Sequence, residues 1–266
     1  MKRYIAQIGI FFTFIISQFI ACLVADSFHK EGYAIENPEN PANIFIIISS
    51  ILIFTFIILL ISKYREKLVK YIFFFFFFIA SISIFDAFFH FISSHYSFIF
   101  AIIFSMLMIF LITRYPKWYI INIFGIFLAS GIIAIFSSLP IAYIIILLSA
   151  LAIYDFISVY KTKHMIKLAK NAISSNLPLL LVFPKRLGRK HRRKDSMYMG
   201  LGDVVIPGIL ITASYINGGF QGFIFTLSGA IFGLAILLFM ASRSPQPGLP
   251  FLNSGAIVGY AIFYFL

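Results

Sequence analysis

Three aspartates lie inside long apolar stretches of the chain: Asp86, Asp155 and Asp203. A charged group in the middle of a membrane costs about 2.5–3.5 kcal/mol on insertion scales, so each calls for a functional explanation. Two carboxyl groups a few ångströms apart cannot both ionise and therefore share one proton. Such a pair can activate water with one member and polarise a carbonyl oxygen with the other. That is the chemistry of peptide-bond hydrolysis.

The positions of the three aspartates indicate which two could meet. Asp155 precedes Lys161, where its apolar run ends, and Asp203 follows Met197, where the next run begins. At about 1.5 Å per helical residue, both lie roughly 9 Å from the same membrane edge. Asp86 lies close to the other edge of the membrane, near the end of the 71–92 run. We therefore expect Asp155 and Asp203 to pair, as a hydrolytic dyad, a transporter's proton relay or a structural contact between helices.

The neighbours of the two aspartates favour the hydrolytic interpretation. Gly200 and Gly202 would let another backbone approach Asp203 closely. Pro207 lacks the N–H that would bond the carbonyl of Asp203, which weakens the helix there. Tyr154 directly precedes Asp155 and could orient it by a hydrogen bond. These residues are predicted to support the site.

A proline-rich segment precedes the last apolar run, with the sequence Pro245-Gln246-Pro247-Gly248-Leu249-Pro250. Residues before proline are disfavoured in the helical region, so we expect this segment to be extended. Non-helical backbone at membrane depth is tolerated only where it lines a cavity or is buried in protein. We therefore predict that it positions substrate beside the aspartates.

The composition is that of a membrane protein. Of 266 residues, 61% are hydrophobic and only 11% charged, and the mean hydropathy is +1.01. Soluble domains carry about a quarter charged residues, so this chain has lipid as its outer solvent. The one cysteine, Cys22, excludes an internal disulfide and a thiolate metal cluster.

Nine apolar runs are close to the ~20 residues that a helix needs to cross a bilayer. We predict an all-α bundle of nine transmembrane helices and prefer an uncleaved first helix to a signal peptide. The spans run roughly over residues 4–24, 44–62, 71–92, 97–113, 118–138, 140–160, 197–217, 220–241 and 248–266.

The basic residues predict how this bundle is oriented. With the N-terminus cytoplasmic and the C-terminus external, every lysine and arginine of the 21 except Lys30 falls on the cytoplasmic side. The basic loop at about 161–196 accounts for most of the net charge of +12. We expect it to anchor the topology and touch anionic lipid heads rather than nucleic acid. Residues 1–138 would then form a scaffold and residues 139–266 the catalytic part.

Three motifs resemble the presenilin and signal peptide peptidase family of intramembrane aspartyl proteases. Tyr154-Asp155, Gly200-Leu201-Gly202-Asp203 and Pro247-Gly248-Leu249-Pro250 look like its Tyr-Asp, Gly-x-Gly-Asp and Pro-Ala-Leu motifs. They fall in family order on the predicted sixth, seventh and ninth spans. Gly248 stands where the family has alanine, and because both are small the sequence alone predicts that Gly248→Ala is tolerated.

The resemblance implies an aspartic endopeptidase that cleaves transmembrane segments or signal peptides without a cofactor or metal. It also implies that the Pro-Ala-Leu element supports the active site. The compact length suggests an archaeal-type relative, and the lack of an Asn-x-Ser/Thr sequon favours a prokaryotic cell membrane.

The sequence also allows other interpretations. Asp86, His90 and His95 could suggest a metal site, but interfacial polar packing is the simpler account. A carboxylate-coupled transporter should show related halves, and none is visible. A prepilin-peptidase-type protease shares Gly-x-Gly-Asp but lacks the Pro-x-Leu element. Glycines four apart favour packing within the bundle over a homo-oligomer face; the pairs are Gly218/Gly222, Gly229/Gly233 and Gly255/Gly259.

Overall fold

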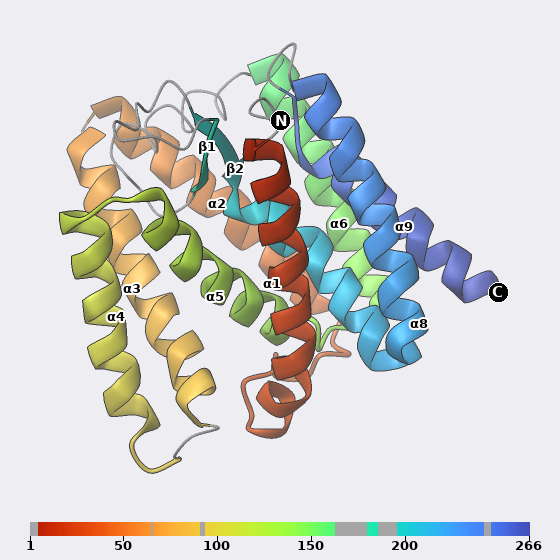
Figure 1. The fold of residues 1–266 in the computed structure, drawn as a ribbon, viewed down its shortest axis with the longest axis horizontal. Helices are drawn as coiled ribbons and strands as arrows, with labels where there is room; N and C mark the ends of the chain where they lie inside the picture. Colours follow the sequence, from red (N-terminus) through yellow and green to blue (C-terminus); the bar gives the residue numbers. More distant parts are fainter. Residues whose placement is uncertain (1–4, 65, 91–93, 163–179, 186–195, 242–245) are drawn as a thin grey trace.

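The fold is a bundle of apolar helices with a small sheet at one end (Figure 1). The computed structural model describes residues 5–64, 66–90, 94–162, 180–185, 196–241 and 246–266. Within them, eight α-helices are α1 (Ile5–Lys30), α2 (Ala42–Tyr64), α3 (Glu66–His90), α4 (Ser97–Arg114), α5 (Trp118–Phe136), α6 (Ile141–Ile157), α8 (Leu201–Ala241) and α9 (Leu249–Phe265). A π-helix, η1 (Ser158–Thr162), extends α6, and the strands are β1 (Leu180–Pro184) and β2 (Ser196–Gly200).

The outer surface of the bundle is apolar. Six of the described helices are long and apolar enough to cross a membrane, and Ala42–Ile58 and Leu249–Phe265 are shorter apolar helices. On α1 alone, Phe12 and Leu23 are 65% and 76% exposed. Large apolar side chains exposed on this scale indicate a surface that faces lipid. The chain is an integral, multi-pass membrane protein.

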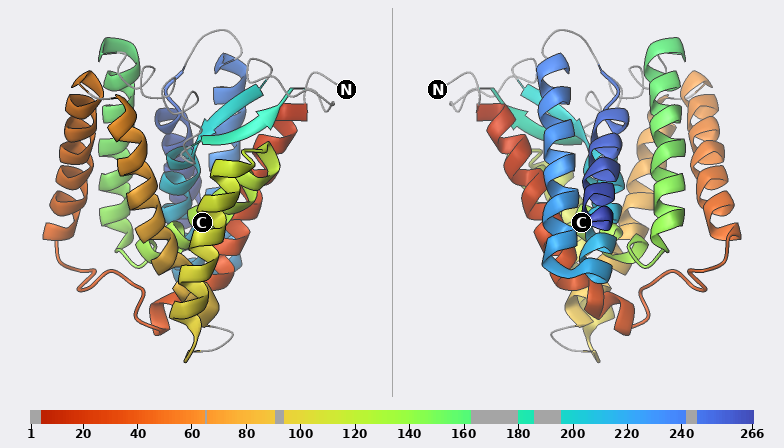
Figure 2. Two further views of the ribbon diagram at one scale, coloured as in Figure 1. Left: turned by 90° about the vertical axis from the view of Figure 1, so that its left-hand side faces the viewer. Right: turned by 90° about the vertical axis from the view of Figure 1, so that its right-hand side faces the viewer.

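One stripe of α1 forms part of the core. Ala6, Ile10 and Phe14 recur at four-residue spacing and are almost completely buried in the main core cluster. Residues four apart share one face of a helix, so this stripe packs α1 against α5 and α8. The sheet and the N-terminus lie at one end of the bundle, and the α1–α2 connection lies at the other (Figure 2).

Two predicted spans, 197–217 and 220–241, form the single bent element α8. Gly219 has φ 59° and ψ −150°, a conformation essentially restricted to glycine, and it separates two helical arms. The arms lie against each other, because Thr226 Oγ1 donates to Ser214 Oγ at 3.0 Å. A Cβ on Gly222 would collide with the carbonyl oxygen of Ser214. The gap between the two predicted spans is therefore a kink at one glycine, in a conformation that glycine adopts without steric cost.

The spaced glycines are used inside the chain, between α8 and α9. A Cβ on Gly229 would collide with the carbonyl oxygen of Gly255, and a Cβ on Gly255 would collide with that of Gly229. A Cβ on Gly259 would meet the carbonyl oxygen of Phe225. Small residues let these backbones touch, so the glycine pattern is explained by packing within the bundle.

The all-α prediction is wrong at the 161–196 loop and at the start of the seventh span. β1 and β2 pair antiparallel, and residues 197–200, predicted to be helical, are strand. Asn122 on α5 anchors β1: its Nδ2 donates to the carbonyl oxygen of Val182 at 2.9 Å, and Val182 N–H donates to its Oδ1 at 2.8 Å. Leu181 and Phe183 are buried against the helices. The part predicted to be amphipathic, 163–175, and most of the basic cluster lie outside the described residues.

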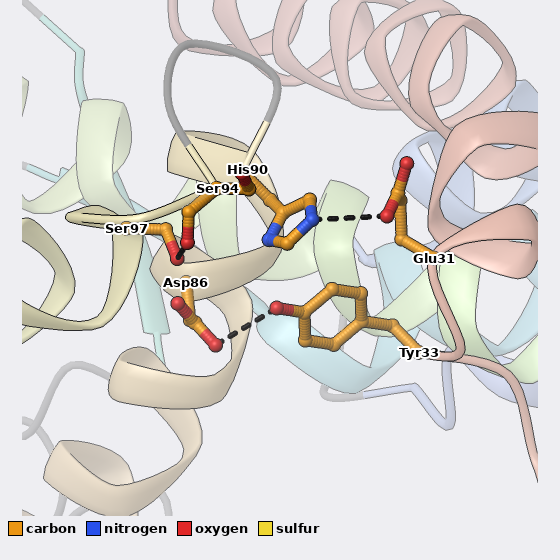
Figure 3. A network of polar contacts seen from close by, with 6 residues as sticks. All are labelled: Glu31, Tyr33, Asp86, His90, Ser94 and Ser97. Atoms are coloured by element: carbon orange, nitrogen blue, oxygen red, sulfur yellow. Dashed lines mark hydrogen bonds and ion pairs between the residues drawn. The ribbon is translucent and has the colours of Figure 1, made fainter.

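The third intramembrane aspartate belongs to a polar network at the end of α3 (Figure 3). Tyr33 O–H donates to Asp86 Oδ2 at 2.8 Å, and His90 Nε2 lies 2.9 Å from Glu31 Oε2. Burial and the Asp86 carboxylate raise the pKa of Tyr33 to about 12, so the phenol remains a donor at neutral pH. No metal-binding group of three His, Cys, Asp or Glu residues occurs in the described part of the chain. The network ties the α1–α2 connection to α3.

Candidate active site

Asp155 is held by the N-terminus of α9. It lies in the last turn of α6 and is only 6% exposed. The N–H of Leu249, the first residue of α9, donates to Asp155 Oδ2 at 3.1 Å. The first N–H groups of a helix have no partner within it and carry partial positive charge, so they suit a carboxylate. The last span therefore points its N-terminus at Asp155.

Asp203 lies on the other side of the same short segment. It is the third residue of α8 and is partly buried. A Cβ added to Gly248 would lie 2.6 Å from Asp203 Oδ1, and one added to Gly200 would lie 3.1 Å from Oδ2. The charge of Asp155 also acts on Asp203. Consecutive residues, Gly248 and Leu249, thus contact the two carboxyl groups and bring α6, α8 and α9 together.

The proline segment differs in conformation from the sequence prediction. Pro247 and Gly248 are buried, but Gly248 has helical angles (φ −79°, ψ −46°), and α9 begins at Leu249. Pro250 is therefore in the first helical turn, where its missing N–H leaves no bond unmade. Pro245 lies outside the described residues. The prediction of an extended segment is wrong from Gly248 onward, because proline can begin a helix as well as interrupt one.

The other predicted support residues play different parts. Leu201 is buried in the main core, and Pro207 is buried inside α8, where helical geometry continues past it. Its weakening of the helix stays a prediction. Gly202 is exposed, and a Cβ there would meet no described atom within 4 Å. Gly200 is close only to the Asp203 carboxyl group itself, so the close approach of another backbone expected at both glycines is found at neither. Tyr154 is half-buried beside Asp155, and its orienting role stays a prediction.

A tyrosine outside the predicted site joins α6 to the same segment. Tyr160 O–H donates to Gln246 Oε1, and its ring packs edge-on against Phe156 at 4.9 Å between centroids. In a regular α-helix at about 100° per residue, Tyr160 would face roughly 140° away from Asp155. The π-helix η1 changes this rotation. Nothing in the sequence signals a π turn, so sequence reasoning missed Tyr160.

Loss of the Tyr160 hydroxyl should loosen the 246–249 segment. We expect Tyr160→Phe, which keeps the ring, to reduce the cleavage rate by roughly three- to tenfold, the range for one hydrogen bond. The matched control is Tyr143→Phe, because that hydroxyl donates to the carbonyl oxygen of Glu39 at 3.0 Å, remote from the aspartates. Equal rates for the two variants would show that the Gln246 contact is irrelevant. Initial rates on one transmembrane peptide decide between these outcomes.

Comparison with known proteins places this arrangement in a family. The family model described as "Signal-peptide peptidase, presenilin aspartyl protease" matches residues 11–266. Signal peptide peptidases of Mus musculus and Homo sapiens are each 32% identical over 159 residues. That match covers 54% of this chain and 40% of each relative.

The similarity extends to three dimensions. Two solved structures of a presenilin family intramembrane aspartate protease, in the C222 and P2 space groups, superpose with a TM-score of 0.69. They are 27% and 29% identical to this chain, and the alignment covers 97% of it and 97% and 96% of those chains. The motifs, the family model and the fold agree, and the chain belongs to the signal peptide peptidase and presenilin family of aspartyl proteases.

Proposed function

We propose that this protein is an intramembrane aspartyl protease that hydrolyses peptide bonds within transmembrane segments or signal peptides, with Asp155 and Asp203 as its catalytic pair. The observation that carries the proposal is the contact of Gly248 and Leu249 with both carboxyl groups. Family membership supports it as well. A transporter or a prepilin-peptidase-type enzyme has no comparable observation in its favour.

The reaction follows from two carboxyl groups that share one proton. The ionised member takes a proton from water as the water attacks the scissile carbonyl carbon. The protonated member donates a hydrogen bond to the carbonyl oxygen as negative charge develops there. Collapse of the tetrahedral intermediate breaks the C–N bond and returns a proton to the leaving amine. The Leu249 N–H would hold Asp155 in place throughout, as a preorganised donor.

Helical substrates need a further step, because a helix shields its own peptide bonds. The substrate must unwind locally before water can attack. Gly248 and Leu249 lie directly beside the two carboxyl groups, and Gly202, the residue before Asp203, has no described atom within 4 Å of where a Cβ would lie. We propose that the Pro247–Leu249 segment positions the unwound residues.

The function is tested by incubating purified protein with synthetic transmembrane peptides and identifying the products by mass spectrometry. A protease gives two fragments whose masses sum to that of the peptide plus one water. Intact peptide across a panel of several transmembrane sequences and both orientations would contradict the proposal.

The proposed topology has nine spans when the two arms of α8 are counted separately, with the N-terminus cytoplasmic and the C-terminus external. The predicted distribution of basic residues supports it. Lys185, directly after β1, and Lys30, the last residue of α1, are both exposed. The sheet and the α1–α2 connection lie at opposite ends of the bundle (Figure 2).

Cysteine labelling tests this topology. In a Cys22→Ala background, Lys30→Cys should react with an impermeant thiol reagent on intact cells, and Lys185→Cys should react only after lysis. Cys22 is buried, so its removal clears the background without exposing a new group. The reverse labelling pattern would invert the topology.

The division into a scaffold (1–138) and a catalytic part (139–266) belongs to the same proposal, since Asp155, Asp203 and the Pro247–Leu249 segment all follow residue 138. Transmembrane peptides are the proposed substrates, and anionic lipid heads the proposed partners of the basic loop. A homo-oligomer and an archaeal source stay predictions from the sequence.

A further inference from the structure

Gln18 is a glutamine on α1 whose side chain is completely buried against α8, the helix that carries Asp203. Gln18 is 0% exposed, and its Nε2 donates to the carbonyl oxygen of Val204 at 3.2 Å. Its Oε1 is buried without a hydrogen-bond partner among the described residues. An unsatisfied buried polar atom destabilises the folded protein. A methionine or leucine would fill this place without that cost, so packing alone does not account for a glutamine.

The contact falls beside a helical hydrogen bond that α8 cannot form. Pro207 has no N–H to offer the carbonyl of Asp203, so the first turns of α8 lack one helical hydrogen bond. Gln18 supplies an amide donor to the very next carbonyl, that of Val204. One turn further along α1 and two turns further along α8, Cys22 Sγ donates to Thr212 Oγ1 at 3.6 Å. Two successive contacts therefore hold α1 against this arm of α8.

Gly208 explains why the glutamine fits. A Cβ on Gly208 would collide with Gln18 Oε1 and would lie 2.6 Å from Ile133 Cδ1. The glycine that closes the sequence Gly202-Asp203-Val204-Val205-Ile206-Pro207-Gly208 thus gives Gln18 its space. Nothing in the positions of Gln18 and Gly208 in the sequence indicates that the two residues lie together.

From this geometry we infer that Gln18 is a positioning residue, which fixes the height and rotation of the α8 turn that carries Asp203. The inference rests on the proposed function, since it assigns Gln18 a role through Asp203. A carboxyl displaced by about 1 Å can lose about 10²-fold in rate, so a modest loosening of this turn is sufficient for a measurable effect.

The first test is Gln18→Met, which keeps the length and volume of the side chain but has no donor. We expect kcat to fall roughly tenfold, KM to change by less than about twofold, and the melting temperature to stay level or rise because the orphaned oxygen is gone. The matched control is Ser130→Ala, which removes a 3.0 Å bond from α5 to the Ser17 carbonyl, one residue from Gln18. That variant should keep its kcat. If kcat and the melting temperature fall together in both Gln18→Met and Ser130→Ala, Gln18 contributes to stability alone and the inference is wrong.

A second test does not depend on activity. In a Cys22→Ser background, which keeps a hydroxyl donor facing Thr212 Oγ1, the Asp155→Cys, Asp203→Cys variant is joined with a short bifunctional thiol reagent. Adding Gln18→Met or Gly208→Ala should lower the crosslinking yield several-fold, whereas Ser130→Ala should not. Unchanged yields would overturn the inference even if the enzyme proved inactive. If the wild type cleaves no peptide but the crosslinking yield still falls in Gln18→Met, the result counts against the proposed function alone.

Discussion

Replacing either aspartate with asparagine is expected to abolish proteolysis, lowering the rate by about 10³-fold or more. Asparagine has nearly the same shape as aspartate but can neither take a proton from water nor share one with a partner. The Asp155→Asn, Asp203→Asn double variant should be no slower than either single variant, since groups that act as one unit lose their effect together. Initial rates on one fluorogenic transmembrane peptide measure this.

Two outcomes would contradict a dyad. Substantial turnover by Asp203→Asn would remove Asp203 from the chemistry, and additive losses in the double variant would make the two carboxyls independent. Asp86→Asn is the matched control, because Asp86 is also an aspartate on an apolar helix but bonds Tyr33 at the end of α3. It should leave the cleavage rate unchanged within about twofold.

Gly248→Ala should lower the rate by about tenfold or more, the opposite of what the sequence alone predicts. Its backbone angles suit alanine, so the expected loss is not due to strain. The added methyl group would lie 2.6 Å from Asp203 Oδ1 and 2.8 Å from its Cγ. The carboxyl group must therefore move, and displacements of this size are costly in preorganised sites. KM should change less than kcat, because the clash is with the protein itself.

Gly202→Ala is the matched comparison for Gly248→Ala. No described atom would lie within 4 Å of its new methyl group, so the protein alone accommodates it. An increase in KM with little change in kcat would show that substrate occupies the space beside Gly202. If Gly248→Ala cleaves as fast as the wild type, Asp203 has more room than the structure gives it, and the bridging role of the segment is wrong.

The helices could be predicted because they depend on local pattern, since long apolar runs dictate spans. The same runs predict that Asp155 and Asp203 lie at one depth, although the residues before Asp203 are strand rather than helix and Asp203 is the third residue of α8. The three motifs predicted the family, which the comparisons confirm. The predicted positions of α3, α4 and α5 agree with the structure to within a few residues.

The details that required the structure depend on contacts between distant residues. β1 pairs with β2 and is held to α5 by Asn122, which bonds Val182, and composition carries no sign of either contact. Pro250 could break a helix or begin one, and only the position of Leu249 against Asp155 decides between them. Gln18 lies 185 residues from Asp203 in sequence numbering, and no sequence pattern links the two. Gly219 could be read as a loop residue, because its positive φ is invisible in the sequence.

The most direct test of the central claim is the affinity of a peptide in which a hydroxyl-bearing tetrahedral carbon replaces the scissile carbonyl. Such a mimic resembles the intermediate held between the two carboxyl groups, so it should bind at least about 10²-fold more tightly than the matching substrate. Both Asp155→Asn and Asp203→Asn should lose that advantage, while Asp86→Asn should retain it. Equal affinity of the mimic for the wild type and for either dyad variant would contradict a site formed jointly by Asp155 and Asp203.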